Sequence, residues 1–127
     1  MGEKGYKKLL VWQKADELAY QIYLGTMKFP NFETYGITSQ LRRAAISIPV
    51  NIAEGTGRQG HNEIKQFANF ALGSLAETEY LLEFSLRLKY LEPMEYERLE
   101  SLQKRSGRIA LEVLQKFLTC RVTWSRS

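Results

Sequence analysis

The sequence has few of the residues on which disulfide-bonded and metal-binding proteins depend. Its 127 residues include one cysteine, Cys120, and one histidine, His61. A lone cysteine cannot form an internal disulfide, and it suits a reducing compartment. One cysteine and one histidine are also too few for a zinc site of His and Cys ligands within one chain. We therefore expect no structural disulfide and no bound metal.

Proline and long apolar segments are also scarce. Only three prolines occur, Pro30, Pro49 and Pro93, so long stretches of the chain are free to form helices. The N-terminus lacks the apolar core of a signal peptide. The most apolar window, residues 44–53, is interrupted by polar side chains and is roughly half the length of a membrane span. The sequence predicts a cytoplasmic protein with no membrane partner.

The charged residues are unevenly distributed along a chain of ordinary globular composition. The formal net charge is +4, and 44% of the residues are hydrophobic and 25% charged. Residues 1–60 carry 8 basic and 5 acidic residues, residues 61–97 carry 3 and 7, and residues 98–127 carry 7 and 2. A basic excess on two segments is compatible with a polyanion partner. It is equally compatible with an acidic helix lying beside a basic one.

Turn-forming residues divide the chain into four segments with the apolar spacing of amphipathic helices. In the first segment Val11, Ala15 and Leu18 step by 4 and 3 residues. Glycines at 55–57 suit the end of the second helix, and Pro93 suits the first turn of the fourth. No strand pattern competes with this interpretation, which predicts an all-α, antiparallel up-down-up-down four-helix bundle. The predicted helices span residues 11–29, 35–54, 62–90 and 93–120 of a single domain, 1–127.

The second segment carries an unusual polar stripe of Gln40, Arg43, Ser47, Asn51 and Glu54. Asn and Ser are poor residues for a helix interior, and Pro49, which lacks an N–H, is expected to kink the helix. One interpretation is a partly exposed polar face. The other is a buried, hydrogen-bonded network at a contact between helices or subunits, with Ser74 and Glu77 of the third segment as partners.

No combination of residues indicates an enzyme. The stripe contains serine, but it contains no histidine that would activate a serine hydroxyl. The glycine-rich segment 55–60 lacks the lysine and the spacing of a P-loop, and a turn is the simpler interpretation. Glu54 and Glu77 are more economically paired with Arg43 than with a cation. We expect no catalytic residue, no cofactor and no metal ligand, although an enzyme built on the stripe would need an open polar pocket.

Basic residues at solvent-directed positions are the candidate contacts to nucleic acid. Arg98, Arg105 and Arg108 share one face of the fourth segment. The other candidates are Lys104 beside them, Arg42 and Arg58 flanking the polar stripe, and Lys7, Lys8 and Lys14 near the N-terminus. The alternative is a solvated surface with weak local ion pairs. Tyr6, Trp12 and Tyr96 are candidates for stacking on unpaired bases, but Trp12 also suits a packing role.

Several runs of residues resemble the signature of one bacterial family. They are Val11–Ala15, Phe29–Pro30, Glu33–Gly36, Gln40–Gly55, Gly57–Arg58 and Ala71–Glu77. The chain resembles the four-helix-bundle family named after the 23S rRNA intervening-sequence protein, over roughly residues 6–118. The accessory variability protein of diversity-generating retroelements, a basic pentamer that partners a reverse transcriptase and binds nucleic acid, is similar to this family.

The resemblance implies a bundle that assembles as a ring-like homopentamer. In a ring, each subunit buries one surface against a different surface of its neighbour. Such contacts would account for the polar stripe and for the third segment, which is apolar on two sides. Five copies would raise the charge from +4 to about +20 per particle. Resemblance transfers fold more safely than function.

These observations give a leading hypothesis and an alternative. The leading hypothesis is a non-enzymatic homopentamer that binds RNA or DNA as an accessory factor in a nucleoprotein complex. Its candidate partner is the reverse transcriptase of a diversity-generating retroelement. The alternative is an oligomeric scaffold for a protein partner, with no direct role in nucleic-acid binding.

Overall fold

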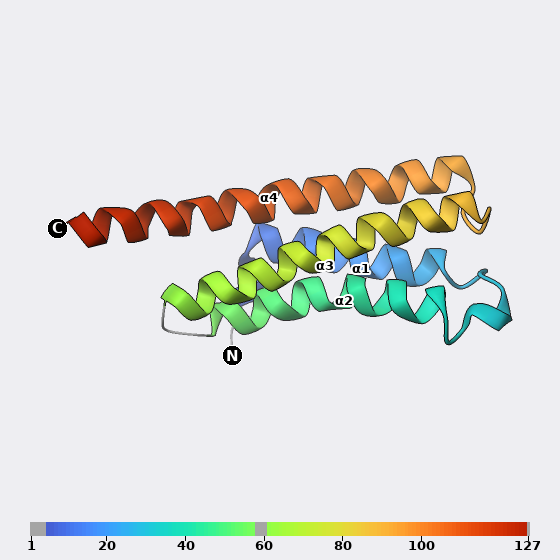
Figure 1. Ribbon diagram of the computed structural model, residues 1–127, viewed down its shortest axis with the longest axis horizontal. Coiled ribbons are helices and arrows are strands. Elements are labelled where there is room, and N and C mark those ends of the chain that lie inside the picture. The colour runs from blue at the N-terminus through green and yellow to red at the C-terminus, as the bar shows by residue number, and fades with distance from the viewer. Residues whose placement is uncertain (1–4, 58–60, 127) are drawn as a thin grey trace.

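The protein is built from four α-helices and two short 3-10 helices (Figure 1). The computed structural model describes residues 5–57 and 61–126, and the side chains of residues 5–57 and 65–116. The 3-10 helices are η1 (Gly5–Lys8) and η2 (Asn31–Glu33). The α-helices are α1 (Leu10–Gly25), α2 (Ile37–Thr56), α3 (His61–Arg87) and α4 (Pro93–Arg126). No strand occurs among the described residues, so the predicted all-helical class is confirmed.

The helices run side by side in alternating directions, as the prediction of an antiparallel bundle requires (Figure 1). Helix α1 packs against α2 and α4, and α3 packs against the same two helices. Helix α4 is 34 residues long and extends past the other helices at the end where the C-terminus lies (Figure 1). None of the described helices is both long and apolar enough to cross a membrane.

One apolar core joins the four helices. Leu18 and Ile22 of α1, Leu41 and Ile48 of α2 and Leu82 of α3 are fully buried in it. Burying each such side chain contributes about 1.5–3 kcal/mol relative to leaving it in water. The apolar spacing that the sequence predicts for the first helix, through Val11, Ala15 and Leu18, is therefore confirmed as a row of core positions. Helix α2 continues through Pro49, which is itself buried, so the proline does not interrupt the helix.

Helix α1 ends at Gly25, four residues before the predicted end at Phe29. The Thr26 hydroxyl donates to the carbonyl oxygen of Ile22 at 2.9 Å, close to the last turn of the helix. Phe29 lies beyond the end of α1 and is buried. The centre of its ring is 5.3 Å from the centre of the Tyr90 ring. The apolar spacing continues past the helix because the connection folds back onto the core.

Helix α3 ends at Arg87 instead of the predicted Tyr90, because Lys89 adopts a left-handed conformation with φ 63°. The backbone N–H of Tyr90 donates to Ser85 O at 2.9 Å, and the N–H of Lys89 donates to Leu86 O at 2.9 Å. This pair of hydrogen bonds is a Schellman motif, in which the left-handed residue is usually glycine. Helix α4 begins at the predicted Pro93 and continues to Arg126, and the remaining bounds differ from the prediction by one or two residues.

Lys89→Gly is expected to raise the free energy of unfolding by about 1 kcal/mol, because glycine has no Cβ to clash in the left-handed conformation. Urea denaturation followed by circular dichroism measures the change. Lys104→Gly, in the interior of α4, is the matched control and is expected to lower stability by about 1 kcal/mol. A loss of stability in Lys89→Gly would contradict this account of the helix end.

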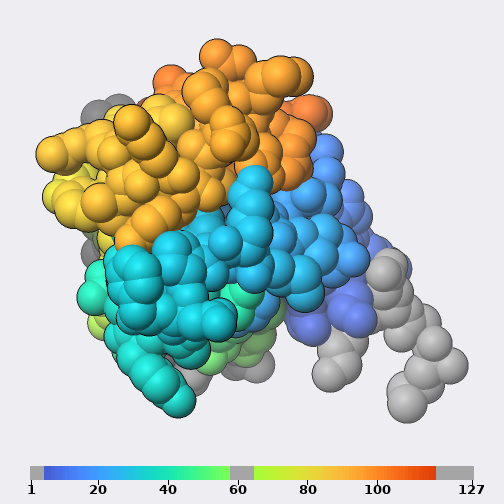
Figure 2. Space-filling model, turned by 90° about the vertical axis from the view of Figure 1, so that its right-hand side faces the viewer, coloured from blue at the N-terminus to red at the C-terminus, as the bar shows by residue number. Residues whose placement is uncertain are grey.

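A carboxylate joins the two connections at one end of the bundle. Glu33 Oε1 accepts a hydrogen bond from the backbone N–H of Ile37 at 3.2 Å, and Glu33 Oε2 accepts one from the Tyr90 hydroxyl at 2.8 Å. Lys28 in the α1–α2 connection also forms an ion pair with Glu95 in the first turn of α4. Figure 2 shows this end, with the α1–α2 connection in cyan against the start of α4 in orange. A Cβ at Gly36 would overlap the Glu33 carboxylate, which explains the glycine there.

Candidate nucleic-acid interface

An open groove of about 440 Å³ lies between α1 and α4. It is lined by Glu17, Gln21, Arg98, Ser101, Leu102 and Arg105. Arg98 and Arg105 are seven residues apart on α4, which places them two turns apart on the same face. Arg98 Nη1 donates to Gln21 Oε1 at 2.8 Å, and this hydrogen bond holds the guanidinium toward α1. The structure thus brings together two of the basic residues that the sequence predicts.

The basic surface continues along the same side of α4. Arg108 is exposed one turn beyond Arg105, and no described side chain forms an ion pair with either arginine. On α1, Lys14 Nζ lies 3.9 Å from Glu17 Oε2, an ion pair one turn along the helix. Two uncompensated guanidinium groups on one helix face give this surface a positive field.

Other predicted basic residues are engaged elsewhere. Arg42 is half-buried between α2 and α1, where its Nε donates to Thr26 Oγ1 at 2.7 Å and its guanidinium lies 5.0 Å from the centre of the Tyr23 ring. Lys104 Nζ lies 3.7 Å from Glu100 Oε1. Both side chains therefore have structural partners away from the groove.

Two of the remaining predicted basic residues lie in the N-terminal 3-10 helix. Lys7 and Lys8 belong to η1 and are exposed. The Lys7 carbonyl accepts a hydrogen bond from Gln13 Nε2 at 2.9 Å, which ties η1 to α1. Arg58 lies outside the described residues. Their contribution to nucleic-acid binding stays a prediction.

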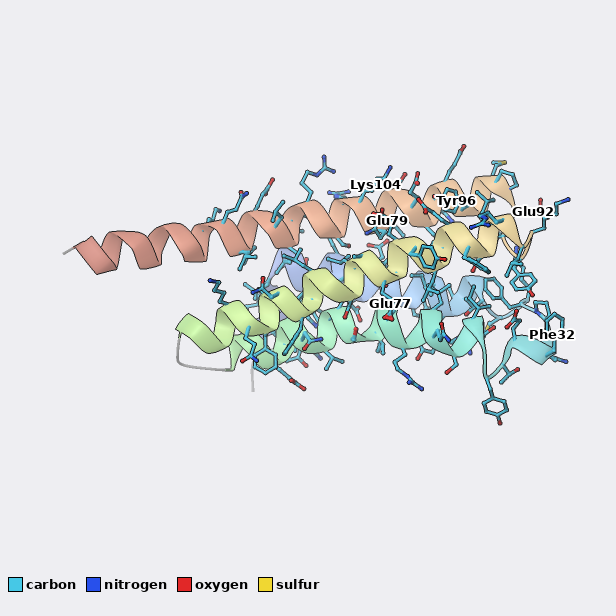
Figure 3. The ribbon with its side chains drawn as sticks, viewed as in Figure 1. Phe32, Glu77, Glu79, Glu92, Tyr96 and Lys104 are labelled. Carbon is cyan, nitrogen blue, oxygen red and sulfur yellow. The ribbon has the colours of Figure 1, made fainter. Side chains whose placement is uncertain are left out.

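The acidic side chains gather on the opposite side of α4, toward α3. Tyr96 donates its hydroxyl to Glu100 Oε2 at 2.6 Å. Burial raises the pKa of Tyr96 well above its ordinary value, and hydrogen bonding to Glu100 and the charges of Glu83 and Glu79 raise it further. Tyr96 and Glu79 lie along the contact between the two helices (Figure 3). This acidic setting disfavours the predicted stacking of Tyr96 on a nucleic-acid base.

The polar stripe lies on the outer side of the contact between α2 and α3. Ser47 Oγ lies 2.8 Å from Ala44 O and 2.6 Å from Ser74 Oγ. Asn51 Nδ2 donates to Ser47 O at 2.7 Å. The structure brings together only these three residues of the predicted network by hydrogen bonds.

The charged members of the stripe are exposed in the single chain. They are Arg43 and Glu54 on α2 and Glu77 on α3, and Gln40 is exposed with them. Figure 3 shows Glu77 on the side of α3 toward α2. Within one chain, the stripe is therefore a partly exposed face. The other interpretation, a buried network, now requires a contact between copies.

A larger cavity of about 800 Å³ lies at the end of the bundle near η1. Its lining is mostly apolar and includes Leu9, Ile52, Phe67 and Val113. Among the described residues, no lysine or arginine lines it, so it offers no cationic side chain to a phosphate group. The Tyr6 and Trp12 rings meet edge to face at 5.2 Å beside it, which favours a packing role for Trp12 over base stacking.

Sequence reasoning missed Gln21, Glu17, Ser101 and Leu102 as lining residues of the groove. The available signal was weak: Lys14, Glu17 and Gln21 are spaced by 3 and 4 residues and so share a helix face. Nothing in the sequence says which neighbouring helix this face meets, because helix pairing is a property of the tertiary fold.

The chain belongs to the family of 23S rRNA-intervening sequence proteins, whose family model matches residues 7–111. A solved structure from Bacteroides thetaiotaomicron, described as a protein of unknown function from the S23 ribosomal protein family, is similar with a TM-score of 0.77. The two chains are 25% identical, and the similarity covers 84% of this chain and 96% of the other. No curated protein matches the chain.

Proposed function

We propose that this protein is a non-enzymatic RNA-binding protein that assembles as a ring-like homopentamer and acts as an accessory factor in nucleoprotein complexes. The observation that carries the proposal is the row of α4 arginines along the α1–α4 groove. Arg105 and Arg108 have no ion-pair partner among the described side chains, and Arg98 is held in place by a neutral amide. The family description, which refers to a 23S rRNA intervening sequence, favours RNA over DNA.

Assembly into a ring would strengthen the positive field of this surface. Five copies multiply the formal charge of +4 to about +20, enough to concentrate a polyanion at moderate ionic strength. The basic α1–α4 side and the acidic α3–α4 side lie on different flanks of α4. A ring that repeats this arrangement presents the basic flank five times.

The outer face of α2 and α3 supports an interface between copies. Ile46 and Val50 of α2 and Phe70 of α3 are exposed beside the polar stripe. Apolar side chains around a few hydrogen-bonding groups are typical of subunit interfaces. In a ring, each copy contacts its two neighbours through two different surfaces. We propose that the outer face of α2 and α3 is one of these two surfaces.

The proposal of a reverse-transcriptase partner rests only on the resemblance to the accessory protein of diversity-generating retroelements. If it exists, the protein should co-purify with the reverse transcriptase of a diversity-generating retroelement through nuclease treatment. The RNA-binding proposal does not depend on this partner.

Fluorescence anisotropy with a structured RNA tests the proposed function. Binding is expected to weaken on the order of a thousandfold between about 50 and 200 mM salt, because each phosphate contact releases counterions. An unrelated helical protein of equal charge is the control. Binding no tighter than that control, or binding without a salt dependence, would contradict the proposal.

The second candidate function, a scaffold for a protein partner, is favoured by one observation. Phe32 and Tyr35 in the α1–α2 connection are 80% and 96% exposed, and Glu33 between them fixes the connection in place. Exposed aromatic side chains on a rigid support are typical anchors of protein interfaces. A partner retained through nuclease and high salt, and lost from Phe32→Ala/Tyr35→Ala, would favour the scaffold over RNA binding.

A further inference from the structure

We infer that the groove between α1 and α4 binds one unpaired nucleotide, with its phosphate on Arg98 and Arg105 and the edge of its base on Glu17. This inference rests on the proposed function and names the form of RNA that the protein recognises. It is carried by the composition of the groove, which combines two cations, one acceptor-only side chain and one apolar side chain.

The cationic part of the groove is arranged for a phosphate. Arg98 and Arg105 project from the same face of α4, separated by about 10 Å along the helix axis. Gln21 orients the Arg98 guanidinium by accepting one of its N–H groups at 2.8 Å and leaves the other donors free. Arg105 lines the same groove without an ion-pair partner among the described side chains. A phosphate between them receives charge-assisted hydrogen bonds from both arginines.

The α1 wall of the groove suits a base and not a second phosphate. The Glu17 carboxylate repels phosphate and only accepts hydrogen bonds, so it suits the N–H and amino groups on the edge of an unpaired base. Leu102, half-buried on α4, supplies an apolar contact for the ring. The Ser101 hydroxyl beside it is both a donor and an acceptor, which suits the sugar hydroxyls.

The groove is large enough for a small ligand and is open to solvent. Its volume of about 440 Å³ is in the range of small-ligand sites, and α1 and α4 form its walls. A base that is paired and stacked in a duplex cannot present its edge to Glu17 there. We therefore expect unpaired RNA to bind more tightly than a duplex of the same sequence.

The chemistry that the groove recognises, a phosphate joined to an amino-bearing base, is present in an RNA strand and in a free nucleotide. Anisotropy of a labelled 12-nucleotide oligoadenylate, with AMP as competitor, distinguishes the two sources. Displacement of the strand by AMP identifies a site that a free nucleotide fills, and failure of AMP to displace it identifies a site that needs the strand.

Arg98→Ala/Arg105→Ala tests the groove directly and is expected to weaken oligoadenylate binding at least about tenfold. The matched control Lys28→Ala/Arg87→Ala also removes two positive charges, and it is expected to change binding less than about twofold. All four positions are exposed, and circular dichroism verifies that each variant is folded.

The outcomes separate this inference from the proposed function. If the wild type binds structured RNA but Arg98→Ala/Arg105→Ala binds oligoadenylate as well as the wild type does, the groove is not the site and the proposed function stands. Equal affinity for the duplex and the unpaired strand also overturns the inference. If the wild type binds no RNA of either form, the proposed function fails as well.

Discussion

Glu33→Ala is expected to lower the free energy of unfolding by about 1–2 kcal/mol. The substitution removes the acceptor for the backbone N–H of Ile37 at the start of α2 and leaves the half-buried Tyr90 hydroxyl without its partner. It thereby separates the α1–α2 connection from the α3–α4 connection. Urea denaturation followed by circular dichroism measures the loss, at one fixed protein concentration because assembly adds to apparent stability.

Two further variants make this prediction specific. Glu92→Ala removes an exposed carboxylate from the neighbouring connection and is expected to change stability by less than about 0.5 kcal/mol. Gly36→Ala is expected to destabilise in the same direction as Glu33→Ala, because the new Cβ displaces the Glu33 carboxylate from both partners. Equal stability of Glu33→Ala and Glu92→Ala would contradict the structural role of Glu33.

Asn51→Leu is expected to break the assembly while leaving the helix content unchanged. Asn51 is half-buried on the polar stripe and donates to Ser47 O, so leucine removes a hydrogen-bonding group from the proposed contact between copies. Light scattering after size-exclusion chromatography is expected to give about 74 kDa for the wild type, five times 14.7 kDa, and a lower mass for the variant. Glu54→Leu is expected to act in the same way.

Asn69→Leu is the matched control, since it makes the same substitution at an exposed position of α3. This variant is expected to keep the mass of the wild type. An Asn51→Leu variant that keeps the native mass would show that the stripe is not a subunit contact. A wild type of 14.7 kDa at micromolar concentration would contradict the ring itself.

The number of helices and most of their core positions were predictable from the sequence, because apolar side chains recur at helical spacing. Leu41 and Ile48 lie where that spacing predicts, fully buried. Helix ends were less predictable, since they depend on capping contacts. The Schellman motif that ends α3 places Lys89 where a glycine would have given the signal.

The candidate site was predictable only in part. The spacing of seven residues between Arg98 and Arg105 indicated a shared face, and the structure places both in one groove. The ion pair of Lys104 with Glu100 was also predictable from the sequence, because the two residues are four positions apart on one helix. The role of Arg42 was not predictable from the sequence, because its partner Thr26 lies outside α2. The two residues come together only when the chain folds.

Ultraviolet crosslinking of the protein bound to RNA, with the modified peptides identified by mass spectrometry, tests the proposed interface most directly. The account predicts adducts on peptides of α1 and of α4 between Arg98 and Arg108, the helices that form the basic groove. Adducts confined to α2 and α3 would contradict it.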